Sequence, residues 1–111
     1  MYKKLIIVLV FAWVIPQNLN WIIVLDFFPE VRETLKAESG LNPKAYNWDG
    51  GAEARGIAQI TKKYHPEISD KQAYDPFWAL TWSINVWYKG NAAKEWTCYK
   101  KLFVQNQKDC M

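Results

Sequence analysis

The spacing of large apolar side chains after helix-starting residues constrains the fold of this chain more than any other sequence feature. Asp75 followed by Pro76 is a typical helix start. The apolar residues that follow recur every three or four positions and would form one stripe: Phe77, Leu80, Ile84 and Trp87. Similar signals predict helices over residues 29–39, 56–64 and 91–103, and no segment alternates apolar and polar residues as a strand does. We therefore expect an all-α domain.

Length and composition indicate one small globular domain. The chain has 111 residues, of which 16% are aromatic, so it can bury a modest core and is not a disordered chain. Its formal net charge of +3 comes from scattered basic residues, which argues against a nucleic-acid partner. The single histidine, His65, precedes a proline and is interpreted as a turn residue. With only two cysteines besides, the chain lacks a four-ligand zinc set, and we expect neither metal nor cofactor.

The first residues have the layout of an export signal. Lys3 and Lys4 precede an apolar run, Leu5–Ile15, that is too short to span a bilayer. A second apolar stretch follows a short polar break, so residues 5–28 could instead anchor the chain in a membrane. The run could also be a buried first helix of the domain.

These signals divide the chain into two parts. We assign residues 1–20 to a signal peptide or signal anchor and residues 21–111 to the domain, and for residues 19–28 we favour a buried helix. The protein is then expected in the periplasm or cell envelope. In an oxidising compartment, Cys98 and Cys110 could form a disulfide, although their spacing also allows two free thiols.

One acidic residue lies on an apolar helix face. Glu38 follows Val31 and Leu35 at helical spacing and lies at the expected end of its helix. Burial and the negative helix end would both raise its pKa, and a carboxylic acid that stays protonated near neutral pH can act as a general acid. The alternative is a glutamate that faces solvent or pairs with Lys36 or Lys44.

Two motifs together resemble a known family. The first is ESGLNP at residues 38–43 and the second is GIAQI at residues 56–60. In this order and at this separation, with Asp75 and Pro76 before a long helix, they are similar to the soluble lytic transglycosylases. The resemblance covers roughly residues 29–99.

The resemblance implies a lysozyme-like helical fold and cleavage of the β-1,4 bond between N-acetylmuramic acid and N-acetylglucosamine. Glu38 matches the family's catalytic glutamate, and Ser39 matches the serine that hydrogen-bonds the carboxyl group or the sugar. Gln59 matches a glutamine of the sugar cleft, with Gly56 and Ile57 beside it in the second motif. The substrate's own N-acetyl oxygen would replace an enzymic nucleophile, and the product would be a 1,6-anhydro ring.

The family's Tyr-Asn-x-Gly motif, which helps to orient the catalytic carboxyl group, has no match in this sequence. Its nearest remnants lie around Tyr88 and Tyr99. These two tyrosines are therefore the candidates for that role.

The stretch between the two motifs holds further candidates. Asp49 or Glu53 could be a second carboxylate that activates water, as in a hydrolytic lysozyme, or both could simply be solvated. Tyr46 and Trp48 could stack on sugar faces or pack under the loop. Arg55 could contact a peptide-stem carboxylate or pair with Glu53.

The sequence thus predicts a lytic transglycosylase that acts on peptidoglycan glycan strands outside the cytoplasmic membrane. Its setting would be a secretion or conjugation machine, or a phage, where it would be virion-associated. Two alternatives stay open, a hydrolytic lysozyme and a non-catalytic peptidoglycan-binding or structural protein. A third, a membrane-embedded assembly factor, depends on residues 5–28 alone.

Overall fold

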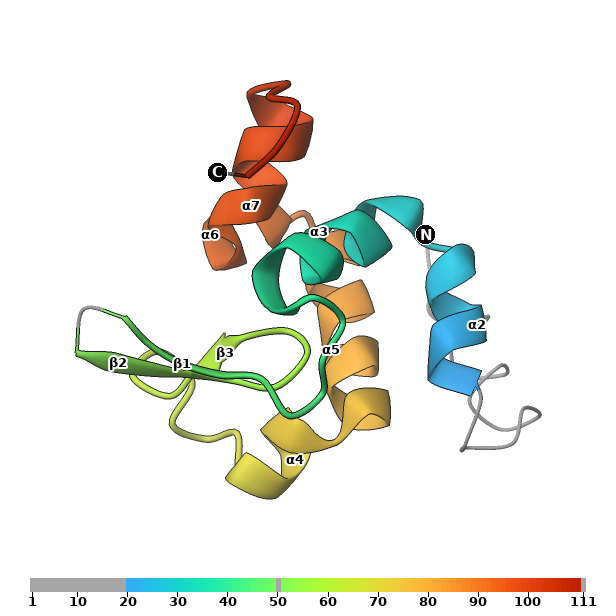
Figure 1. The fold of residues 1–111 in the computed structure, drawn as a ribbon. Helices are drawn as coiled ribbons and strands as arrows, with labels where there is room; N and C mark the ends of the chain where they lie inside the picture. The colour runs from blue at the N-terminus through green and yellow to red at the C-terminus, as the bar shows by residue number, and fades with distance from the viewer. Residues whose placement is uncertain (1–19, 50, 111) are drawn as a thin grey trace.

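The computed structural model describes residues 20–49 and 51–110, which form an α+β domain (Figure 1). Two helices come first, α2 (Asn20–Asp26) and α3 (Pro29–Ser39). A three-stranded antiparallel sheet follows, made of β1 (Tyr46–Asp49), β2 (Ala52–Arg55) and β3 (Ile60–Thr61). The later elements are helical: α4 (Asp70–Tyr74), α5 (Pro76–Tyr88), α6 (Ala92–Glu95), α7 (Thr97–Tyr99) and a π-helical turn, η1 (Lys100–Val104).

The expectation of an all-α domain is wrong, because residues 46–61 contain the sheet. Tyr46 pairs with Arg55 in an antiparallel hairpin, and Arg55 pairs in turn with Ile60. The strands are only four, four and two residues long. Strands this short carry too few residues for an alternating pattern to stand out.

Two of the expected helices are also wrong. Residues 56–64 form turns and β3 instead of a helix. The helix expected over residues 91–103 is interrupted at Trp96, whose extended backbone (φ −125°, ψ 119°) separates α6 from α7. The interruption allows the Trp96 indole N–H to donate to the carbonyl oxygen of Ala58 at 2.9 Å, and this contact could not be inferred from helical spacing.

The two other long helix predictions are confirmed, and their ends follow from local chemistry. Pro29 begins α3, and Gly40 ends it with a left-handed backbone (φ 65°) that donates its N–H to Lys36. The Asp75 carboxylate accepts the first two N–H groups of α5, those of Phe77 and Trp78.

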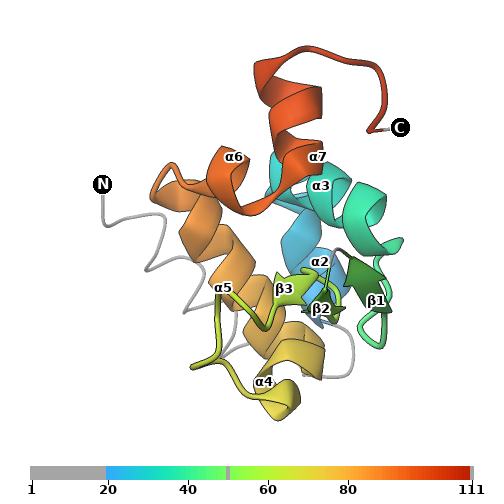
Figure 2. The same ribbon diagram turned by 90° about the vertical axis from the view of Figure 1, so that its left-hand side faces the viewer.

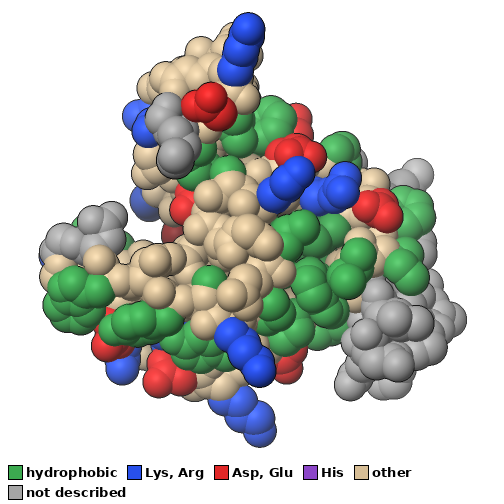
Figure 3. Space-filling model, in the orientation of Figure 1, with side chains coloured by type: hydrophobic (Ala, Val, Ile, Leu, Met, Phe, Trp, Pro, Cys, Tyr) green, Lys and Arg blue, Asp and Glu red, His purple; other side chains and the backbone are tan. Residues whose placement is uncertain are grey.

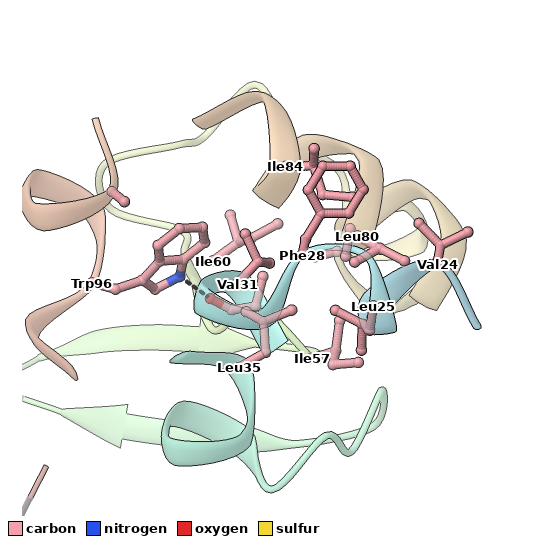
Figure 4. Packing of buried hydrophobic residues seen from close by; sticks show 14 of the residues in the cluster. Val24, Leu25, Phe28, Val31, Leu35, Ile57, Ile60, Leu80, Ile84 and Trp96 are labelled. Carbon is pink, nitrogen blue, oxygen red and sulfur yellow. Dashed lines mark hydrogen bonds between the residues drawn. The ribbon is translucent and has the colours of Figure 1, made fainter. Parts of the chain in front are cut away.

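The core lies between α2, α3, α5 and the turn that follows β2 (Figure 4). Leu35 of α3 and Ile57 of the turn are fully buried in it. Beside the core, the Arg55 guanidinium is 1% exposed and donates to Asp70 and to the carbonyl oxygen of Ile68, both at 2.9 Å. These bonds compensate its buried charge and tie the sheet to α4. Arg55 is therefore a structural residue and does not pair with Glu53 as one expectation had it.

Helix α2 packs on α3 and α5 with Val24 and Leu25 buried. The predicted signal peptide or anchor lies mostly outside the described residues. Among the residues that are described, none of the helices is both long enough and apolar enough to cross a membrane. The cysteines Cys98 and Cys110 form a disulfide.

Gly56 starts the turn after β2, where the chain passes close to the backbone of α4. Its φ is +77°, and a Cβ atom built there would lie 1.9 Å from the carbonyl oxygen of Ala73 in α4. Its N–H also donates to the carbonyl oxygen of Ala45 at 2.7 Å. Only glycine fits this position without moving α4.

We predict that Gly56→Ala destabilises the domain more than Gly90→Ala. Gly90 has a similar φ of +80° but open space around it, so its variant carries only the left-handed penalty of roughly 1–2 kcal/mol. The Gly56 variant adds a steric clash, which costs on the order of 1–3 kcal/mol more. Denaturant unfolding of both variants measures the difference, and equal losses would contradict the close approach to α4.

Candidate active site

A groove of about 1120 Å³ runs between the sheet and the C-terminal helices. One wall is formed by the β1–β2 hairpin, β3 and the loop after β3, and the other by α5, α6 and the start of α7. Figure 2 looks onto this side, with α6 and α7 above the sheet and α5 beside it, and Figure 3 shows the surface hollowed between the hairpin and the C-terminal helices. Glu38, at the end of α3, reaches the groove from between these walls.

Glu38 is half-buried, and its environment alters its acidity. Burial raises the pKa of its carboxyl group, because the charged form loses hydration. The backbone N–H of Cys98 donates to Oε1 at 3.2 Å and lowers the pKa by a smaller amount. The net pKa is raised, in the direction expected from the sequence. Among the described residues, neither Lys36 nor Lys44 forms an ion pair with it.

The residues of the second motif, 56–60, are divided between the core and the groove. Ile57 is fully buried, and its carbonyl oxygen lies 2.6 Å from the Ser39 hydroxyl, which also lies 3.0 Å from the Leu35 carbonyl oxygen. Ser39 thus joins the end of α3 to the turn. Gln59 lines the groove; its amide nitrogen donates to the Gly56 carbonyl oxygen at 2.9 Å. Its amide oxygen accepts from Nδ2 of Asn47, another groove residue, at 2.7 Å.

One face of the β1–β2 hairpin lines the groove. Alternation and register place Asn47, Ala54 and Thr61 on the face that lines the groove. Tyr46 and Glu53 belong to the other face, where the Tyr46 hydroxyl donates to the Glu53 carboxylate at 3.2 Å. Neither of these predicted site residues lines the groove.

The other two hairpin candidates lie nearer to the groove. Trp48 lies at the rim and is 65% exposed, although alternation puts its side chain on the face of Tyr46. Asp49 pairs with Ala52 at the end of the hairpin, and its side chain lies outside the described part of the chain.

Aromatic side chains line the other parts of the groove. Tyr64, in the loop after β3, is 72% exposed. Trp82 of α5 makes edge contacts with the rings of His65 and Trp96, at centroid distances of 5.3 and 6.0 Å. An exposed aromatic ring in a groove is the kind of surface on which a sugar ring can stack.

Sequence reasoning missed a contact between two titratable side chains within the groove. Nε2 of His65 lies 2.8 Å from Oε2 of Glu95, and Nδ1 lies 3.4 Å from the exposed Glu67. His65 lies at a turn, as the sequence predicts, with its carbonyl oxygen accepting from Ile68 N–H at 3.1 Å. Its side chain also joins the loop after β3 to α6. Glu95 is thus a second groove carboxylate besides Glu38. The sequence around Glu95 does not indicate a site, because an acidic residue on a short helix usually faces solvent.

The two candidate tyrosines lie away from the groove. The Tyr99 hydroxyl donates to Glu30, at the opposite end of α3 from Glu38, at 2.9 Å. This acceptor also receives the Trp87 indole N–H at 3.0 Å. The Tyr88 hydroxyl is buried and has no hydrogen-bond partner among the described residues. The donor to Glu38 is instead the Cys98 backbone amide, a group that side-chain motifs cannot reveal.

Within the described residues, no cluster of three or more His, Cys, Asp or Glu side chains could hold a metal ion. The groove itself offers acid–base chemistry, with Glu38 at a raised pKa and amide, hydroxyl and aromatic groups around it. Comparison with models of protein families, with curated proteins and with solved structures finds no match to this chain.

We predict that Glu38→Gln stabilises the fold at neutral pH. The raised pKa means that the folded chain holds this proton more tightly than the unfolded chain, so wild-type stability falls as the pH rises through the folded pKa. Glutamine stays neutral and keeps an oxygen for the Cys98 N–H. The stability gap should therefore be present near neutrality and close as the pH falls below the ordinary value of 4.5.

Thermal unfolding across this pH range measures the gap. Glu33→Gln removes one negative charge from an exposed position on the same helix and is the matched control. A gap of the same size and pH dependence in both variants would contradict a special environment at Glu38.

Proposed function

We propose that this protein cleaves the glycan strands of peptidoglycan, with Glu38 as the general acid and base. The observation that carries the proposal is a half-buried carboxyl group of raised pKa that faces an extended, polar groove. A fully solvated glutamate would keep its ordinary pKa.

The dimensions and chemistry of the groove suit a polysaccharide. Its volume of about 1120 Å³ lies above the usual range of small-molecule pockets, roughly 300–1,000 Å³, and leaves room for several sugar rings. Asn47, Gln59 and Thr61 offer hydrogen bonds to sugar hydroxyl and acetamido groups, and Tyr64 offers an exposed ring.

Peptidoglycan in particular, and a transglycosylase product, are suggested by the motifs of residues 38–43 and 56–60. In the first step, Glu38 gives its proton to the glycosidic oxygen as the C1–O bond breaks and the substrate's N-acetyl oxygen bonds to C1. The Glu38 carboxylate then takes the proton of the muramoyl 6-hydroxyl, whose oxygen displaces the acetamido oxygen from C1. The products are a free 4-hydroxyl and a 1,6-anhydro ring, with no water consumed.

One observation favours a second candidate, hydrolysis in the same groove. Glu95 also lines the groove and is held by His65 at 2.8 Å. A second carboxylate that activates water would give reducing ends instead of anhydro ends. For either reaction we propose a place outside the cytoplasmic membrane, where peptidoglycan lies; the Cys98–Cys110 disulfide fits an oxidising compartment.

Digestion of purified sacculi with the full-length chain, followed by mass spectrometry of the products, tests the reaction. We expect 1,6-anhydro products, each lighter by one water than a hydrolytic product. Glu38→Gln should reduce their rate by roughly a hundredfold or more, because loss of the general acid removes this much. Glu53→Gln, outside the groove, is the control and should keep wild-type activity.

Other product patterns would identify the alternatives. Reducing ends that disappear in Glu95→Gln would establish a hydrolase with Glu95 as the second carboxylate. Sacculi that bind equally to wild type and Glu38→Gln, without any products, would show a binding protein and contradict the enzymatic proposal.

We predict that Tyr64→Ala weakens binding of soluble peptidoglycan fragments roughly two- to twelvefold, since an exposed aromatic contact contributes about 0.5–1.5 kcal/mol. Tyr46→Ala is the matched control, because Tyr46 is similarly exposed but lies outside the groove. Titration of both variants in the Glu38→Gln background prevents turnover. Equal losses from both tyrosines would contradict the groove as the glycan site.

A further inference from the structure

Three structural features meet at Cys98. Its backbone N–H donates to Glu38 Oε1 at 3.2 Å, its side chain is bonded to Cys110, and it lies in the first turn of α7. Within the described residues, this amide is the hydrogen-bond donor found on the Glu38 carboxylate.

The amide is available because a helix begins there. The first N–H groups of a helix have no acceptor within it, and the extended backbone of Trp96 makes Thr97 the first residue of α7. The Glu38 carboxylate takes one of these free donors. Its orientation therefore depends on where the first turn of α7 lies against α3.

The segment that follows η1 folds back on Lys101 through hydrogen bonds. Residues 105–109 are exposed, and two bonds tie this segment back to Lys101: Gln107 N–H to the Lys101 carbonyl oxygen at 2.9 Å, and Lys101 Nζ to the Cys110 carbonyl oxygen at 3.0 Å. The disulfide adds a covalent bond from Cys110 to the 6% exposed Cys98. It clamps the C-terminal segment onto the turn that supplies the amide.

We propose that the Cys98–Cys110 disulfide is a positioning element for Glu38, which fixes the Cys98 amide against the carboxylate and makes full activity depend on the oxidised cysteine pair. The inference rests on the proposed function of Glu38. It assigns the disulfide a role in the reaction geometry, beyond a general contribution to stability.

This role has a pH signature. The charged and titratable groups that line the groove with Glu38 are Lys63, Tyr64 and His65 on one wall and Lys94 and Glu95 on the other. None of them is attached to the disulfide, so we expect its removal to act on Glu38 through the Cys98 amide. Because this amide favours the charged form of Glu38, its displacement should raise the pKa of Glu38 further and move the alkaline limb of the rate profile to higher pH.

The test compares Cys110→Ala with Lys101→Ala in the full-length chain. Both changes loosen the C-terminal segment, but only the first removes the disulfide. We expect Cys110→Ala to lower kcat on peptidoglycan roughly tenfold, because this factor corresponds to the loss of one hydrogen bond to a charged group. The alkaline limb of its rate profile should move to higher pH. Wild type treated with a phosphine reductant should behave in the same way, whereas Lys101→Ala should keep the wild-type kcat and profile.

Two outcomes would overturn the proposal. One is a Cys110→Ala variant with wild-type kcat and an unmoved alkaline limb. The other is a decrease in kcat no larger than the decrease in the fraction of folded protein, which circular dichroism measures at the assay temperature. A disulfide that only stabilises the fold would give that result.

A second measurement separates this inference from the proposed function. NMR titration of the labelled Glu38 carboxyl carbon, assigned with Glu38→Gln, reports its pKa in wild type and Cys110→Ala without any turnover. A higher pKa in Cys110→Ala supports the positioning role even if the wild-type chain cleaves no glycan. Identical titration curves would refute the role even if the chain is an active enzyme.

Discussion

The arrangement of the site depends on the short turn that follows β2. Gly56 passes against α4 without a side chain, Ile57 is buried in the core, and the Ile57 carbonyl oxygen lies 2.6 Å from the Ser39 hydroxyl at the end of α3. The next carbonyl, that of Ala58, accepts the indole N–H of Trp96 from between α6 and α7. One turn thus connects the sheet, the helix that carries the candidate acid and the opposite wall of the groove, and a shift in it would alter the position of all three.

The raised pKa of Glu38 reflects a burial that opposes stability at neutral pH. Removing water from a carboxylate destabilises the folded chain at neutral pH, and the amide of Cys98 offsets only part of this effect. A buried charge kept for structure would be compensated more fully, as Arg55 is by Asp70 and by backbone carbonyl groups. The contrast between these two charged residues in one small domain is a physical reason to look for function at Glu38.

Sequence reasoning succeeded where the determining interactions are local. The bounds of α3 follow from Pro29 and Gly40, and the direction of the Glu38 pKa shift follows from its place on an apolar face. It failed for the sheet of residues 46–61, whose strands are too short to show a pattern, and where contacts between distant segments decide: the break at Trp96 and the pairing of His65 with Glu95 across 30 positions. The last two depend on tertiary packing that leaves no periodic or motif signal in a single sequence.

The same distinction explains why the expected tyrosine role is not seen near Glu38. A motif identifies side chains, but the donor to Glu38 is a backbone amide, 60 positions away along the chain. Any residue type except proline could supply this amide, so the local sequence around residue 98 need not resemble a known orienting motif. The position of the amide in space is what has to be maintained, and a covalent bond to a neighbouring segment is a direct way for a chain of 111 residues with a small core to maintain it.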